Sequence, residues 1–595
     1  MKRNLALITA VLLLVTLLAG CGGGNTTTPT NAPAPTNAPA PTAAPATPSG
    51  SNATPAPATP EPTPDPGPYN MAAGKYAVDS RGVPLEKYEY ELPLTTTDEK
   101  FVYLISPVLP SQIDPDNYED MPYPKFLRET TGIHIEYMLV TAQSRRENFA
   151  ALLATDAVPD LISWYKNYYP STMLSSIEDG YSVNLYDYKE YMPNYYYEIW
   201  NHEDDVNLRG TCMQNDHTIA TFECLNNKCQ LGYGGCVRGD WIDKLGIKVN
   251  DIVTFDDMHD VLYAFQSQIG DPYPYILFND LDSHRYMNGF DTICTYKGTV
   301  APQMVMDGKV VFCCSTENDK NYMSTMNKWY NEGFINPNWR NWFGNVTCAA
   351  EMQQNHGGIT SMLPTEASGY VDLETTPEAY WIAIHQPVRY EGQVFHVGHT
   401  ASWRQQVGNM SIGARCENIP LLVTYVDWFY SPNGSFQANW GPENYIWEYN
   451  ENGERQLTDF IVNNPSGASW SILQFAFDDV YEAGILIRER SFAYPGGEKL
   501  QEWYDIWNDP NYYRYDASME FPSSLTYSAE DSSYLATVGT DINTFIAENY
   551  LAFVDNSKPM SEWDSYVDTL THMTGWNEAL EIYQEAYDDF KARLG

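Results

Sequence analysis

The sequence predicts an α/β fold, and three observations lead to that expectation. From about residue 91 the chain alternates short β-rich runs with helical stretches, the pattern of layered α/β proteins. Hydrophobic residues make up 43% and aromatic residues 14% of the chain, enough to build large cores. The length of 595 residues indicates more than one core-forming unit, because single cores rarely grow past about 250–300 residues.

Residues 1–20 are expected to be a lipoprotein signal peptide. Lys2 and Arg3 precede an apolar run from Leu5 to Leu18, and small residues lead to Cys21. The Cys21 thiol would carry the lipid, with acyl chains such as palmitate. The alternatives are an ordinary secretory signal with a chance cysteine or an N-terminal membrane helix, for which the apolar run is short.

Residues 21–90 are expected to form a tether between this anchor and the folded protein. The segment is rich in Pro, Thr and Ala and carries no charge before Glu61. It lacks large apolar side chains to offset its ordering entropy, and its prolines favour extended polyproline II. We therefore expect residues 91–595 to be held at the outer face of a cell membrane, of Gram-positive type.

The first elements of the folded part predict a parallel sheet. The expected order is strand 101–105, a helix ending at Thr130 before Gly132, strand 133–140, helix 145–155 and strand 161–164. In such sheets, ligands bind beyond the carboxyl ends of the strands. Trp164 and Tyr165 lie at one such end and are candidate ligand-binding residues.

An ordered series of short motifs extends from about residue 100 to 592. The segments are Lys125–Ile133, Asn148–Asp156, Val158–Ile162, Arg238–Gly246, Thr254–Met258, Asp307–Val311, Trp329–Pro337, Asp427–Tyr430, Asn439–Trp447 and Ile582–Asp588. Each motif is weak alone, but the series, in this order, resembles the family 1 extracellular solute-binding proteins of carbohydrate ABC importers, in their larger, lipoprotein-like branch.

The resemblance implies a two-lobed, periplasmic-binding-protein-like (type 2) fold with a hinge between its lobes. Its first crossing is expected near 215–236, the return near Gly357-Gly358-Ile359 and the next crossing near 405–415. Lobe 1 would then contain approximately 95–215 and 358–408, and lobe 2 approximately 236–357 and 412–595. Such lobes close over a ligand by hinge motion.

The resemblance also implies a sugar ligand, whose apolar faces suit aromatic rings and whose hydroxyls suit polar side chains. Asp240 is a further candidate, although helix capping is the alternative role for it. Together with Trp164 and Tyr165, the candidate ligand-binding residues are Asp240, Trp403, Arg404, Trp440, Glu443 and Tyr445.

No metal or other cofactor is expected. Relatives in this branch often have a calcium-binding loop after the position of Phe265, whereas this chain continues Gln-Ser-Gln-Ile-Gly-Asp-Pro. Cys212, Cys224, Cys229 and Cys236 do not have zinc-ligand spacing, so buried thiols with at most one disulfide are the favoured interpretation over zinc.

The net charge and the lack of known catalytic motifs in the sequence argue against several classes of function. A formal charge of −43 argues against nucleic-acid binding, and no catalytic string of the G-x-S-x-G, H-E-x-x-H or P-loop type occurs. We expect a monomeric, non-enzymatic receptor that delivers an oligosaccharide to an ABC permease. The alternatives are a ligand sensor for a membrane kinase, a peptide receptor or a lipid-anchored glycoside hydrolase.

Overall fold

The computed structural model describes most of the chain after the tether. The described residues are 67–107, 113–141, 144–169, 172–201, 208–228, 231–278, 286–293, 299–342, 345–398, 404–463, 483–487, 493, 497–522, 525 and 527–594. The expected signal peptide, the lipidation site Cys21 and most of the expected tether lie outside them.

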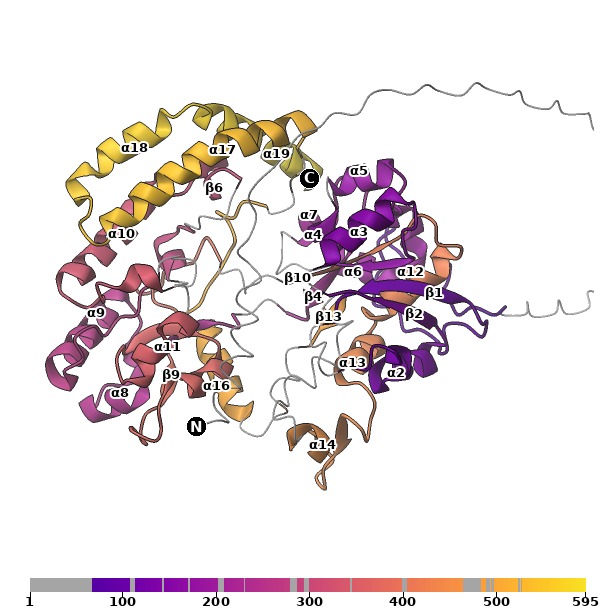
Figure 1. Cartoon of the computed structure of the whole chain (residues 1–595), viewed down its shortest axis with the longest axis horizontal. Helices are drawn as coiled ribbons and strands as arrows, with labels where there is room; N and C mark the ends of the chain where they lie inside the picture. Colours follow the sequence, from indigo (N-terminus) through magenta and orange to yellow (C-terminus); the bar gives the residue numbers. More distant parts are fainter. Residues whose placement is uncertain are drawn as a thin grey trace, which may run out of the picture. The chain divides into compact units, whose positions relative to one another are not determined.

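A six-stranded sheet in the order β13-β4-β10-β3-β1-β2 organises the first lobe (Figure 1). Four of its strands run parallel to β1, and β10 is antiparallel to both of its neighbours. This confirms the expected α/β class and the parallel pairing of the first three strands. The strands are β1 Lys100–Ile105, β2 His134–Leu139, β3 Leu161–Ser163, β4 Phe222–Asn226, β10 Gln405–Ile412 and β13 Gly484–Leu486.

Helices pack on both faces of this sheet, with α2 and α3 on opposite sides of it in Figure 1. Strand β1 serves both faces because its side chains alternate: Phe101 and Tyr103 enter one core cluster and Leu104 enters another. The helices of this lobe are α2 Pro122–Thr131, α3 Arg145–Ala154, α4 Tyr165–Tyr168, α5 Met173–Glu178, α6 Pro193–Trp200, α7 Leu208–Cys212, α12 Ile419–Trp428, α13 Pro432–Trp440 and α14 Asp459–Val462, beside the hairpin β11 Trp447–Tyr449 and β12 Arg455–Leu457.

The second lobe has its own core around a three-stranded antiparallel sheet in the order β8-β5-β9, and a separate hairpin β6-β7. The strands are β5 Gly234–Arg238, β6 Gln303–Met306, β7 Lys309–Phe312, β8 Ile359–Met362 and β9 Trp381–Ala383. The helices are α8 Gly239–Leu245, α9 Phe255–Ala264, α10 Glu317–Asn331, α11 Asn345–Gln353, α16 Gly497–Trp507, α17 Ala529–Asn549, α18 Trp563–Thr571 and α19 Trp576–Leu594.

Local sequence signals set several element ends. Helix α2 stops where Gly132 adopts φ 75°, a left-handed conformation that glycine adopts at no steric cost. Thr254 and Asp257 form a reciprocal capping box at the start of α9. Asp307 and Gly308 form the turn between β6 and β7, and both have positive φ.

The division of the chain between the lobes differs from the expected one. Strand β8 pairs with β5, so residues 358–362 stay in the second lobe. Gly358 permits close packing rather than a crossing, since a Cβ there would lie 2.3 Å from the Phe265 ring. Helices α12 and α13 contribute to the first-lobe core, as does β13. The chain therefore returns to the first lobe before β10 and leaves it again only after β13.

The folded part also begins earlier than expected. Ala72, Val83 and Tyr90 are buried in the first-lobe core, so residues 67–90 belong to this lobe rather than to the tether. Within the described part of the chain, no helix has both the length and the apolarity needed to cross a membrane.

Candidate ligand-binding site

The carboxyl edge of the six-stranded sheet carries a partly exposed aromatic side chain, Trp164. It follows β3 directly and has φ 57°, an unusual conformation for a residue other than glycine. Its backbone N–H donates to the carbonyl oxygen of Asn409 at 2.6 Å, which fixes this turn against β10. The Trp164 side chain is half-buried, as expected of an aromatic residue at a strand's carboxyl end.

Amide and charged side chains surround this turn. Asn409 is buried; its Oδ1 accepts from the Lys166 N–H at 3.0 Å and its Nδ2 donates to Asn167 Oδ1 at 3.1 Å. The Lys166 ammonium pairs with the buried Glu223 at 2.5 Å. An aromatic ring next to positioned amides is the combination that binds the apolar face and the hydroxyls of a sugar.

Three chain crossings leave or enter the first lobe at the same edge, since β4 and β13 end there and β10 starts there. The Asn226 N–H donates to the Arg404 carbonyl oxygen at 2.6 Å, and the Asn227 N–H donates to that of Leu486 at 3.0 Å. These backbone hydrogen bonds hold the three crossing segments side by side where they meet the sheet. This is the place at which a hinge motion would begin.

The Arg404 side chain also helps to hold these crossing segments together. Its side chain is 1% exposed; Nε donates to the Asn226 carbonyl oxygen at 2.9 Å, and the guanidinium pairs with the buried Glu198 at 2.7 Å. Lys87 also pairs with Glu198. The Arg404 guanidinium therefore anchors β10 within the first lobe.

On the second lobe, the edge at which β5 begins is built from α16 and the residues after β9. Asn508 both donates to and accepts from the backbone of Leu231, at 2.9 and 2.6 Å. Trp507 Nε1 donates to the Gly235 carbonyl oxygen at 2.9 Å, and a Cβ on Gly234 would lie 2.6 Å from the indole. Because Gly234 at the start of β5 has no side chain, the Trp507 indole can pack directly against the strand.

His385, directly beyond β9, has an unusual environment at this edge. Its ring stacks on Tyr512 at 3.7 Å, and Nδ1 lies 3.2 Å from the Ile506 carbonyl oxygen. Its Nε2 is buried and has no hydrogen-bond partner among the residues that the structure describes, and burial lowers the pKa of the imidazole. Sequence reasoning missed His385, Trp507 and Asn508; the aromatic-rich stretch 503–515 was the one available signal.

Two other sequence-predicted candidates lie within packed regions. Tyr165 is fully buried, stacking on Tyr169 with a ring separation of 5.5 Å. Asp240, in the second lobe, is 4% exposed and accepts two hydrogen bonds from Arg238, at 2.8 and 2.9 Å. It lies in the first turn of α8 and makes no side-chain cap there.

The remaining candidates lie at the end of α13 and directly after it, in the first lobe. Trp440 is 7% exposed and packs against Trp447, while the Arg455 guanidinium lies over its ring at 5.2 Å. Glu443 and Tyr445 are exposed. The structure thus groups Trp440, Glu443 and Tyr445 in one segment, and Trp164, Tyr165 and Arg404 at the sheet edge; Trp403 lies outside the described residues.

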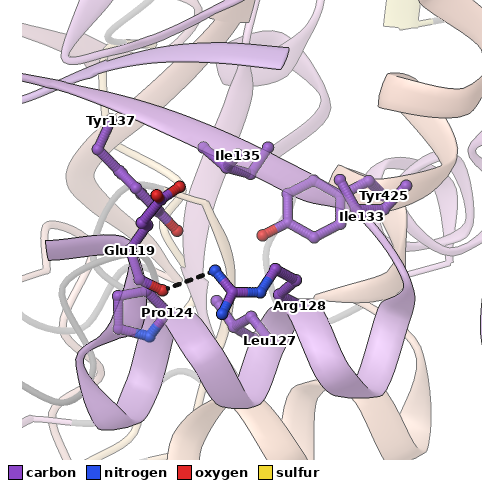
Figure 2. A pocket seen from close by; sticks show the side chains of 8 residues that line it. All are labelled: Glu119, Pro124, Leu127, Arg128, Ile133, Ile135, Tyr137 and Tyr425. Atoms are coloured by element: carbon purple, nitrogen blue, oxygen red, sulfur yellow. Dashed lines mark hydrogen bonds between the residues drawn. The ribbon is translucent and has the colours of Figure 1, made fainter. Parts of the chain in front are cut away.

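A narrow pocket between α2 and β2 is a poor candidate for a ligand site (Figure 2). Arg128 points into it, but its Nη1 donates to the Glu119 carbonyl oxygen at 3.0 Å and its Nη2 pairs with Asp120 at 2.6 Å. Ile133 and Ile135, also in the lining, lie just before and at the start of β2, away from the carboxyl edge. Nor do the described residues contain a cluster of three or more His, Cys, Asp or Glu side chains suited to a metal.

The fold was compared with known proteins. No protein-family model and no curated protein matches the sequence. The structure is similar to an HMO binding ABC-transporter associated solute binding protein from Bifidobacterium longum infantis, at 16% identity, over 82% of this chain and 99% of that chain, with a TM-score of 0.63. The chain has the fold of extracellular solute-binding proteins.

Two further solute-binding structures, both from Streptococcus pneumoniae, have the same fold. The ABC-transporter substrate binding protein FusA in complex with kestose covers 83% of this chain and 100% of its own, at 18% identity and a TM-score of 0.54. The N-glycan transport protein NgtS covers 82% and 98%, at 13% identity and a TM-score of 0.51. The two-lobed fold expected from the sequence motifs is therefore confirmed.

Proposed function

We propose that this protein is a lipid-anchored extracellular receptor that captures an oligosaccharide and delivers it to an ABC transporter permease. The observation that carries the proposal is the half-buried Trp164, held by its backbone N–H on the Asn409 carbonyl oxygen, at the sheet edge where backbone hydrogen bonds join three crossing segments. A ligand held there would touch the segments that move when the lobes close, so binding would favour the closed form.

The similar proteins support the same ligand class. One is described as HMO binding, one is in complex with kestose and one transports N-glycans. Their names describe binding and transport rather than catalysis, which supports a receptor that does no chemistry. The small residues before Cys21 support a lipid anchor at the outer face of the cell membrane, and we expect a monomer.

Replacement of Trp164 by alanine should weaken oligosaccharide binding by about 2 kcal/mol, roughly 30-fold, because stacking area on the sugar face is lost. Isothermal titration with the oligosaccharide that binds the wild-type protein measures the change. Tyr263→Ala is the matched control, since Tyr263 is 60% exposed on α9 of the second lobe. Equal affinity of the Trp164 variant and the wild-type protein would remove Trp164 from the site.

A further inference from the structure

A second cavity lies in the second lobe, away from the sheet edges described above. It has a volume of about 370 Å³ and is bordered by α9, α10, the short helix Met287–Phe290 and Arg389. Phe255, Phe290 and Trp329 line it, and each is at least nine-tenths buried. The cavity therefore has an aromatic floor formed by side chains of the lobe's own core.

One face of α10 supplies a polar wall. Asn321, Ser324, Thr325 and Lys328 follow the i, i+3, i+4, i+7 spacing of a single helix face. Thr325 Oγ1 donates to the Asn321 carbonyl oxygen at 3.1 Å. The side chains of Asn321 and Ser324 have no hydrogen-bond partner among the described residues, so their donors and acceptors are free for a ligand.

Two cationic side chains, Lys328 and Arg389, border the same cavity, and neither forms an ion pair within the described part of the protein. The chain has 77 acidic and 34 Lys and Arg residues, so a cation has many possible acidic partners. Burial raises the pKa of Asp291 and the Arg389 charge opposes that rise, but no ion pair joins the two.

The other ionisable groups of the lining do not neutralise these cations. Asp256 is exposed at the first turn of α9 and is the one carboxylate in the lining. His259 is engaged with Glu332, with Nε2 at 2.8 Å from its carboxylate. The lining therefore carries two cations against one carboxylate.

We propose that this cavity is a second ligand site, for a small hydroxyl-bearing carboxylate such as a hexuronic acid. Lys328 and Arg389 bind the carboxylate, Asn321, Ser324 and Asp256 bind hydroxyls, and the aromatic floor receives the apolar face of the ring. The site is independent of the sheet edge that contains Trp164, and the proposal does not depend on the transport function.

The test uses two probes that differ only in the carboxylate, D-glucuronate and D-glucose, titrated calorimetrically into the purified protein at low salt. We expect glucuronate to bind and glucose not to bind. Lys328→Ala and Arg389→Ala should each weaken glucuronate binding about tenfold, the loss expected for one charge-assisted hydrogen bond. Both side chains are exposed, so both variants should fold as the wild-type protein does.

Two controls separate this site from others. Lys320→Ala removes a cation from the same helix that is already paired with Asp564 at 2.9 Å, and it should leave glucuronate binding unchanged. Trp164→Ala should also leave it unchanged. The proposal is overturned if neither probe binds, if both bind equally, if Lys320→Ala weakens binding as much as Lys328→Ala, or if Trp164→Ala abolishes glucuronate binding.

Discussion

Replacing Arg404 with methionine should lower the free energy of unfolding by about 3 kcal/mol, because it removes one of the two cations that pair with the buried Glu198 carboxylate and leaves Lys87 to balance it alone. Arg404 and Glu198 are 1% and 3% exposed and pair at 2.7 Å. Methionine keeps much of the side-chain volume, so the lost charge dominates the effect. Urea unfolding of the wild-type and variant proteins measures the difference.

Two further variants test whether the buried Arg404–Glu198 pair accounts for the lost stability. Arg415→Met breaks an exposed pair with Asp156 and should cost less than about 1 kcal/mol. Adding Glu198→Gln to Arg404→Met removes the carboxylate that has lost one of its two cations, while the Lys87 ammonium still donates to the Tyr430 carbonyl oxygen at 2.9 Å. The second substitution should therefore restore part of the stability. If Arg404→Met and Arg415→Met cost the same, the buried pair does not anchor β10.

Replacing Asp427 with alanine should also cost about 4 kcal/mol, because it leaves several buried donors without an acceptor. Asp427 is fully buried at the end of α12. It accepts from Tyr90 Oη at 2.7 Å, from the backbone N–H and Nδ2 of Asn194 at 3.1 and 2.9 Å, and from the Tyr195 N–H at 2.7 Å. Its carboxylate thus satisfies free N–H groups in the first turn of α6. Asp251→Asn, at an exposed position, is the control.

The same variant has a pH signature. Burial raises the pKa of Asp427 to about 6. Because the folded-state pKa exceeds the unfolded value of about 3.9, this group's contribution to stability is present at low pH and decreases as pH rises through about 6. Unfolding at about pH 5 and about pH 8 should show a larger difference between the wild-type protein and Asp427→Ala at the lower pH. A larger difference at the higher pH would contradict this assignment.

The early strands and helices could be predicted because their signals are local. Phe101–Ile105 and Leu161–Ser163 are short apolar runs, and Gly132 marks a helix end, so β1, β3 and α2 were placed within a residue or two. Their parallel pairing followed from the alternation of strands and helices.

The chain crossings could not be predicted because they depend on pairing between distant segments. Strand β10 lies between β3 and β4, and no local pattern specifies that position. Strand β13 has three residues, too few for a sequence pattern, so the last crossing was missed. Gly357-Gly358 has the composition of a turn, but the small size of these residues allows Ile276 to pack against Gly357 and Phe265 against Gly358.

The candidate site was predictable only where it follows directly from a strand end. Trp164 was found because it follows β3, whereas the next residue, Tyr165, turns into the packing beneath α3 and stacks on Tyr169. Arg404 was expected near a chain crossing, but its ion pair could not be predicted because its partner Glu198 is distant in sequence. His385 carries no local signal, since its environment is created by Tyr512 and Ile506.

The most direct test of the central proposal is a thermal-shift screen of the protein with neutral and acidic oligosaccharides, monosaccharides and peptides. A ligand that binds only the folded state raises the melting temperature by mass action. The proposal predicts a saturable shift with one family of oligosaccharides and recovery of that sugar unchanged. A response to peptides alone, no response to any oligosaccharide, or recovery of a shortened sugar would contradict it.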